Sequence, residues 1–305
     1  MAETCTVFEV GPRDGLQNEP ARVSFKDKLQ FISELAACGI NEIEVGAFVR
    51  EDRVQQMAET DLIYDAIHER TIRLGTTEAW SLVPNRKGLQ RALLAGAKNL
   101  AVFTAATDSF TQKNIGMSIR ESLAEFREVI REAKQQDPNI RFRGYVSTAF
   151  GCPFEGKVAP PKSLRVVEAL LRMGVEQVSI GDTIGVATPD QMDQIMKPAL
   201  KSFGVKKIAG HFHDTRGTAL ANVLRSLEIG IRTFDSSAGG LGGCPFAPGA
   251  SGNLATEDLL YLLHGLRFKT GINLAKLCQT SLWLAKRLKH SLPSRYLAAY
   301  ASDCR

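Results

Sequence analysis

Two histidines two positions apart, His211 and His213, are the residues most suggestive of chemistry in this sequence. They lie in the stretch HFHD, at the end of a run typical of a β-strand, residues 207–213. Side chains at positions i and i+2 of a strand point to the same face, so both imidazoles would face one side of the sheet. Two aligned imidazoles suit a divalent metal ion, although a pair of hydrogen-bonded core histidines would give the same pattern.

Polar residues follow three other predicted strands. Arg13 and Asp14 come just after residues 6–10, where Asp14 offers a carboxylate to a metal and Arg13 could neutralise an anionic oxygen. The same two residues could equally form a turn with a local ion pair. Glu44 and Asp182 lie at the ends of the predicted strands 41–45 and 177–180. Their carboxylates could position the arginine, a base or a metal, or simply pair with cations of the fold.

A glycine-rich stretch, GGLGG at residues 239–243, precedes Cys244 and, further on, Asn253. Glycines let the backbone approach a ligand closely, but no Lys-Ser/Thr pair follows, so this is not a P-loop. Cys244 is either an acid/base thiol or an ordinary buried cysteine. Two histidines, one aspartate and one asparagine form an N/O ligand set that suits Mg2+ or Mn2+. Such an ion can stabilise an enolate, which predicts a carbon–carbon lyase or its synthetic reverse.

Strand-like and helix-like segments alternate along the whole chain. Eight short β-branched runs are each followed by a helical pattern, and the strands are expected at residues 6–10, 41–45, 70–76, 99–104, 140–147, 177–180, 207–213 and 231–235. The intervening helices are expected at residues 24–38, 52–68, 85–96, 118–135, 161–173, 189–203, 218–230 and 256–265. This order predicts a (β/α)8 TIM barrel, where strand ends converge on one face and gather the polar residues above. We expect one domain over residues 1–305, with the barrel at about 5–265 and a C-terminal helical extension that has a helix near 273–290.

Composition narrows the choice of partners and compartment. The net charge of +5 comes without a clustered basic run, so nucleic-acid binding is not expected. Six cysteines occur with no CxxC pair, which favours reduced thiols in the cytoplasm over a disulfide scaffold. No apolar run approaches the length of a membrane span, and no targeting segment is evident. We therefore expect a soluble cytoplasmic protein with a small-molecule substrate.

Several stretches together resemble the 3-hydroxy-3-methylglutaryl-CoA (HMG-CoA) lyase family. The resemblance is found at residues 9–19 (EVGPRDGLQNE), 143–152 (RGYVSTAFGC), 152–157 (CPFEGK), 181–186 (GDTIGV), 211–215 (HFHDT) and 238–258 (AGGLGGCPFAPGASGNLATED). The resemblance implies a TIM barrel that cleaves HMG-CoA to acetyl-CoA and acetoacetate with Mg2+ or Mn2+, as a homodimer. It further implies that the metal ligands are Asp14, His211, His213 and Asn253. Arg13 would stabilise the enolate, and the thiol of Cys244 would transfer a proton. Glu44 and Asp182 would support this centre or take part in proton transfer.

One segment departs from the family pattern. The family commonly has Thr-Ser-Phe-Val-Ser-Pro-Lys-Trp after its second strand, whereas residues 46–53 here are GAFVREDR. This difference lies beside Glu44 and leaves open a branched or differently sized 3-hydroxyacyl-CoA. Lys113 and Asn114 are expected to contact the CoA portion. Two alternatives stay open: a related condensing enzyme or aldolase, and a catalytically silent barrel used for binding.

Overall fold

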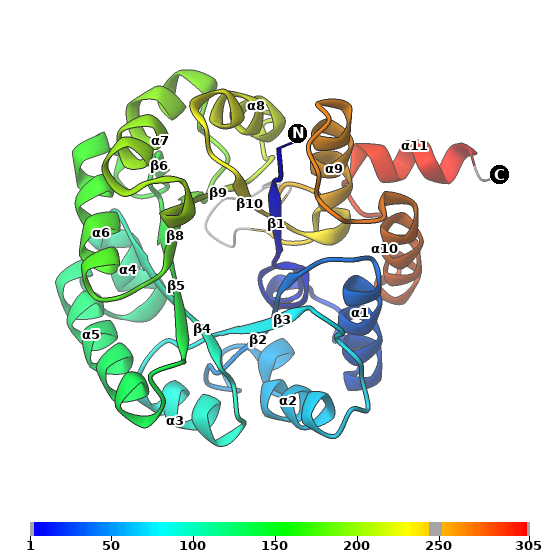
Figure 1. The fold of residues 1–305 in the computed structure, drawn as a ribbon, viewed down its shortest axis with the longest axis horizontal. Helices are drawn as coiled ribbons and strands as arrows, with labels where there is room; N and C mark the ends of the chain where they lie inside the picture. Colours follow the sequence, from blue (N-terminus) through cyan, green and yellow to red (C-terminus); the bar gives the residue numbers. More distant parts are fainter. Residues whose placement is uncertain (1–2, 244–251, 304–305) are drawn as a thin grey trace.

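A closed barrel of parallel strands forms the centre of the computed structural model, which describes residues 3–243 and 252–303. Among these residues, eight strands pair in the order β1-β10-β9-β8-β5-β4-β3-β2, and β1 closes the ring by pairing with both β10 and β2 (Figure 1). The strands of the barrel are β1 (Thr6–Glu9), β2 (Glu42–Ala47), β3 (Glu78–Leu82), β4 (Asn99–Ala105), β5 (Arg141–Ser147), β8 (Gln177–Asp182), β9 (Ile208–Phe212) and β10 (Thr233–Ser236). The predicted TIM-barrel class is confirmed.

Helices form a ring around the barrel (Figure 1). The ring consists of α1 (Phe25–Ala37), α2 (Thr60–His68), α3 (Arg86–Leu94), α5 (Ile119–Gln136), α6 (Pro160–Arg172), α7 (Pro189–Phe203), α8 (Ala219–Ile229) and α9 (Thr256–Gly265). Helix α5 illustrates why these segments fold as they do. Ser118 and Glu121 form a capping box at its start, and Phe126, Val129 and Ile130 follow at helical spacing on the buried face.

Additional elements decorate the barrel. A short helix, α4 (Asp108–Ile115), lies between β4 and α5, and a two-stranded hairpin, β6 (Gly151–Cys152) with β7 (Gly156–Lys157), follows β5. Helix α10 (Leu274–Leu288) packs against α1 and α9. The last helix of the described chain, α11 (Arg295–Asp303), packs against α9 and α10 (Figure 1). The C-terminal extension thus contains a second helix, after residue 290, in addition to the one expected near 273–290.

Two predicted elements were wrong in position. Residues 70–76 do not form the third strand; the strand is Glu78–Leu82, and Arg70 has a left-handed φ of 60° that ends α2 instead. Ile72 is buried and had mimicked a strand pattern. The second helix begins at Thr60 rather than at residue 52. The preceding segment contains only a short 3-10 helix, Gln55–Met57, in which Gln56 is buried and donates its amide to the Ala21 carbonyl.

The barrel interior is unusual in holding aromatic and charged side chains. Phe8, Val10 and Trp80 form a small apolar cluster there, separate from the large core between strands and helices. The guanidinium carbon of Arg143 lies 4.0 Å from the centre of the Phe8 ring. Buried charges need partners, so the interior is a place where ionic groups are fixed in defined positions.

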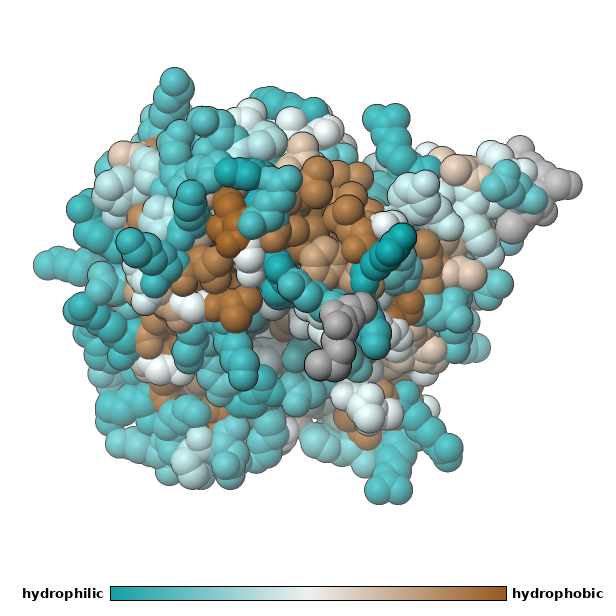
Figure 2. All heavy atoms as spheres, turned by 45° about the horizontal axis from the view of Figure 1, so that its top comes forward, coloured by the Kyte–Doolittle hydropathy of each residue, from teal (hydrophilic) through white to brown (hydrophobic). Residues whose placement is uncertain are grey.

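Figure 2 shows hydrophilic residues over much of one face, with hydrophobic residues gathered in its upper part. Large apolar side chains with substantial exposure include Leu224 of α8 and Tyr261 of α9. Among the residues that the structure describes, no helix is both long and apolar enough to cross a membrane.

Candidate active site

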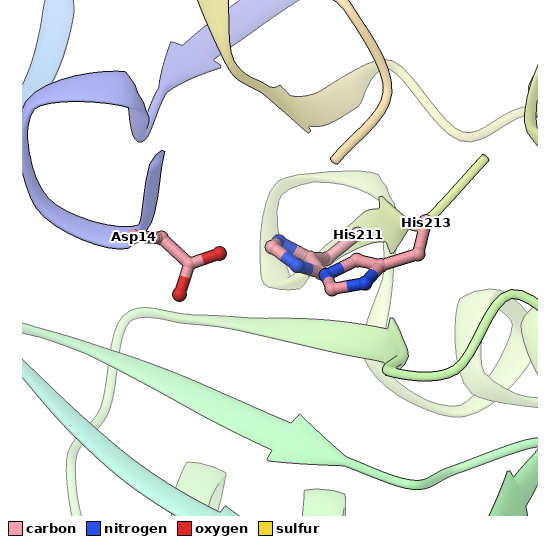
Figure 3. A group of neighbouring side chains, drawn as sticks. All are labelled: Asp14, His211 and His213. Carbon is pink, nitrogen blue, oxygen red and sulfur yellow. The ribbon is translucent and has the colours of Figure 1, made fainter. Parts of the chain in front are cut away.

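Three side chains predicted to meet do meet at the carboxyl ends of the strands. Asp14 lies in the helical turn η1 (Gly11–Gly15) after β1, His211 in β9, and His213 just beyond β9. One ligand atom from each residue lies within 4.8 Å of the other two. The Asp14 carboxylate points toward the two imidazole rings, whose centres are 5.3 Å apart (Figure 3). The geometry suits a small divalent cation.

Asn253 completes this group of N and O donors. Its amide nitrogen donates to Asp14 Oδ2 at 2.9 Å and to the Leu241 carbonyl at 3.0 Å. Its Oδ1 is buried and has no hydrogen-bond partner among the described residues, and the same holds for Nδ1 of His213. Unpartnered buried acceptors are rare in folded proteins and call for an explanation such as an ion. Asp14, His211, His213 and Asn253 therefore fit Mg2+ or Mn2+.

The electrostatics of the cluster favour the metal-binding forms of His213 and Asp14. Burial lowers the pKa of His213 to about 4, and the neighbouring His211 acts in the same direction. Burial alone would raise the pKa of Asp14, but Arg13 and the two histidines outweigh it and hold that pKa below its ordinary value. A neutral imidazole and an ionised carboxylate are the forms that bind metals. The alternative from sequence was a pair of hydrogen-bonded core histidines. His211 does have a hydrogen bond of this kind, to Asp235, but Nδ1 of His213 has no partner among the described residues.

Arg13 lies beside the cluster and is fixed by Glu44. Its Nε and Nη2 both contact Glu44 Oε2, at 2.7 and 2.6 Å, and its Nη1 contacts Asp14 Oδ1 at 2.6 Å. Tyr145 donates its hydroxyl to the same Glu44 oxygen. Strand β2 continues to Ala47, so Glu44 lies inside the strand and not at its end as predicted. Burial raises the pKa of Glu44 even though Arg13 opposes the rise.

Asp182 ends β8, as predicted, but its contacts are with the following loop. One carboxylate oxygen accepts from the Val186 amide at 3.0 Å and the other from the Ala187 amide at 2.9 Å. Burial raises the pKa of Asp182 to about 6, while these amides act to lower it. The carboxylate thus stabilises the loop after β8, and this arrangement favours a supporting role over proton transfer.

A cavity of about 300 Å³ opens beside the cluster. Its lining combines charged and polar side chains with four apolar ones. The described residues that line it are Arg13, Asp14, Gln17, Asn18, Arg53, Val54, Leu82, Phe103, Phe110, Asn114, Ser147, Thr183, His211, His213 and Gly243. Asn114, one of the two predicted CoA contacts, is among them. The ammonium group of Lys113 instead lies 3.8 Å from the centre of the Phe154 ring. Cys244 lies outside the described residues.

Sequence reasoning missed the residues directly behind the cluster. Asp235 in β10 contacts Nδ1 of His211 and forms an ion pair with Arg143 of β5. Burial would raise the pKa of Asp235, but Arg143 and His211 hold it at about 2. A charged residue at the end of a predicted strand, on the same face as the other site residues, was the available signal. Gln17 was missed as well, although it donates to Asp14.

A closed parallel barrel with metal-ligand side chains at the carboxyl ends of its strands defines a TIM-barrel enzyme with a candidate divalent-metal centre. Residues 4–283 match the model of the HMGL-like family. The hydroxymethylglutaryl-CoA lyase of Pseudomonas mevalonii is 46% identical over 296 residues, which cover 97% of this chain and 96% of that protein. This chain belongs to the HMGL-like family.

Two further relatives bear on the substrate. The 3-hydroxy-3-isohexenylglutaryl-CoA/hydroxymethylglutaryl-CoA lyase of Pseudomonas aeruginosa is 46% identical over 268 residues, covering 88% of this chain and 87% of that protein. An HMG-CoA lyase from Acinetobacter baumannii has been solved in complex with coenzyme A and 3-methylmalate. Its structure matches with a TM-score of 0.91 and 38% identity, covering 97% of this chain and 95% of that chain.

Proposed function

We propose that this protein is a hydroxymethylglutaryl-CoA lyase that cleaves HMG-CoA to acetyl-CoA and acetoacetate by a retro-Claisen reaction. The observation that supports it most is the position of Arg13, which lines the same cavity as Asp14, His211 and His213. The near full-length similarity to the Pseudomonas mevalonii lyase points to the same activity. A barrel used only for binding would have no need to retain this combination.

We assign the divalent-metal site to Asp14, His211, His213 and Asn253. A bound Mg2+ or Mn2+ there would act as a Lewis acid toward the hydroxyl and carboxylate oxygens of the substrate. The donors are already gathered and largely buried, so little reorganisation is needed for binding.

Arg13 is assigned the stabilisation of the thioester enolate. Its guanidinium is held from behind by Glu44 and reaches the cavity in a fixed orientation. A preorganised cation in a water-poor site stabilises developing negative charge more strongly than solvent does. Proton transfer is assigned to the Cys244 thiol on the resemblance to the family. Glu44 then acts by positioning Arg13, and Asp182 by stabilising the loop after β8.

The cavity lining bears on which acyl group the substrate carries. Arg53, the last residue of the segment that departs from the family pattern, lines the cavity together with the next residue, Val54. Leu82, Phe103 and Phe110 give it an apolar wall that can receive the alkyl substituent or the pantetheine arm. HMG-CoA is the favoured substrate because both Pseudomonas relatives described above are named as lyases of HMG-CoA.

A coupled assay for acetoacetate tests the proposal. Purified protein should release acetoacetate from HMG-CoA with Mg2+ or Mn2+ and lose that activity with chelator. 3-Hydroxy-3-isohexenylglutaryl-CoA should be assayed in parallel. Turnover of only the larger thioester would keep the reaction but overturn the substrate assignment, and absence of cleavage with both would overturn the lyase assignment.

We also propose a homodimer in the cytoplasm. Light scattering of the purified protein would measure the mass in solution, and a mass near 33.3 kDa would contradict dimerisation. Cell fractionation would test the compartment.

A further inference from the structure

The carboxylate of Asp235 contacts His211, one of the three residues of the candidate metal cluster. Asp235 is 2% exposed, and its Oδ2 is 3.1 Å from Nδ1 of His211. The same oxygen accepts from the Ser179 hydroxyl at 2.6 Å and from Arg143 Nη1 at 3.2 Å. Its other oxygen accepts from Arg143 Nη2. Each of these contacts requires a donor on the partner, because an ionised carboxylate can only accept.

Arg143 is fixed in turn by the barrel interior. It is 1% exposed, and its guanidinium carbon lies 4.0 Å from the Phe8 ring centre and 5.0 Å from the Tyr145 ring centre. Its Nε donates to Gln177. Arg143 does not line the cavity and so cannot contact a substrate there. The buried cation keeps Asp235 ionised and immobile.

We propose that Asp235 is a positioning residue that fixes His211 as its Nδ1–H tautomer and so presents the Nε2 lone pair toward Asp14. This inference rests on the proposed metal site, because the lone pair is useful only to an ion bound there. A carboxylate behind a ligating histidine orients the ring and raises its basicity. Arg143 and Ser179 support this role by holding Asp235 from the other sides.

The two histidines of the cluster are therefore not equivalent. His213 Nδ1 has no hydrogen-bond partner among the described residues, whereas His211 Nδ1 has a fixed anionic one. Of these two histidines, only His211 has a partner among the described residues that determines its tautomer. We expect it to be the preorganised ligand of the pair.

Asp235→Asn is the most informative substitution, since it preserves shape. The asparagine has one acceptor oxygen, and we expect it at the Oδ1 position, where the contact from Arg143 Nη2 is shorter than the Nη1 contact at the other position. The amide NH2 then faces His211 Nδ1 and requires that nitrogen to accept. His211 should switch to its Nε2–H tautomer, in the manner by which an asparagine behind a catalytic histidine selects the wrong tautomer.

Nitrogen-15 NMR of the histidine rings in metal-free protein reads the tautomer directly. We expect Nδ1–H for His211 in the wild type and Nε2–H in Asp235→Asn, with His211→Gln used to assign the signal. Calorimetric titration with Mn2+ should show about 10- to 100-fold weaker binding in Asp235→Asn, the usual effect of losing such an outer partner. Ser179→Ala, which removes one bond to Asp235 but keeps its charge, should give a smaller loss.

Glu42→Gln is the matched control, because Glu42 is another barrel carboxylate that accepts from a ring N–H, that of Trp80. It should leave the His211 tautomer and Mn2+ affinity unchanged. An Nε2–H tautomer in the wild type, or unchanged Mn2+ affinity in Asp235→Asn, would overturn the inference. A wild type that binds no Mn2+ would overturn the proposed metal site instead, while the metal-free NMR result still decides the Asp235–His211 relation.

Discussion

The barrel holds two buried arginine–carboxylate pairs next to one aromatic ring, and the surroundings of the two pairs differ. The guanidinium carbons of Arg13 and Arg143 lie 5.3 and 5.0 Å from the centre of the Tyr145 ring. Arg13 pairs with Glu44 and lines the cavity, whereas Arg143 pairs with Asp235 and is enclosed. In the first pair the cation, Arg13, faces the cavity. In the second pair the anion, Asp235, contacts a histidine.

Depth in the barrel explains the difference. Arg13 lies in the turn beyond β1, at the rim where TIM-barrel active sites form, whereas Arg143 is the third residue of β5. A cation at the rim can face a ligand on one side and a carboxylate on the other. A cation within the strands has only protein partners, so its effect must pass through them.

Removal of the enclosed arginine should have the largest effect on stability. Arg143→Met leaves the Asp235 carboxylate buried without its cation, and breaking such a pair typically costs about 3–5 kcal/mol. Urea denaturation should show this loss in free energy of unfolding. A loss below about 1 kcal/mol would mean that Asp235 does not depend on Arg143.

Removal of the rim arginine should instead act on turnover. Arg13→Met is expected to reduce kcat by about two or more orders of magnitude while the protein stays folded. The fold survives because Glu44, whose pKa is already raised by burial, can take up a proton when its cation is lost. The matched control is Arg141→Met, at the opposite end of the barrel. Near-normal turnover in Arg13→Met would remove Arg13 from the reaction.

A buried carboxylate without an arginine partner gives a third case. Asp182→Asn replaces an acceptor of two backbone amides by one with a single acceptor oxygen, which should cost about 1–3 kcal/mol of stability. Turnover should fall less than in Arg13→Met. A variant of unchanged stability with kcat reduced as far as in Arg13→Met would favour direct participation in proton transfer.

Glu9 is a fourth buried carboxylate, and it should make stability depend on pH. Burial raises its pKa to about 7, while its contacts with Thr256 and the amides of Ala238 and Gly11 oppose the rise. A carboxyl with a raised folded-state pKa stabilises the fold below its unfolded pKa of about 4.5, and that contribution is lost as the pH rises to about 7.

The slope should be about 1.4 kcal/mol per pH unit from this group. Glu9→Gln should flatten the fall in unfolding free energy between pH 5 and 7 by about that amount, measured by urea denaturation. Parallel slopes in wild type and variant would contradict the shifted pKa. Phe8→Leu, at the neighbouring position, controls for a general loss of packing.

The arrangement of the strand ends was predictable from sequence. Asp14, His211 and Asn253 are far apart in the chain but meet because parallel strands bring their carboxyl ends together. The third strand was misplaced because Ile72, although buried, lies in a loop. Over a few residues, the apolar pattern of a buried loop cannot be told from that of a short strand. The position of Asp235 at the end of a predicted strand marked it as a candidate, but its contact with His211 is visible only in the fold, which places β10 beside β9.

Binding of Mn2+ tests the central claim, a divalent-metal site beside Arg13, most directly. Calorimetric titration of the wild type should give one ion per chain, and His213→Ala should lose most of that affinity, more than the loss expected for Asp235→Asn. Thermal melting would confirm that the variant is folded. Equal Mn2+ binding by the wild type and the folded His213→Ala variant would contradict the account.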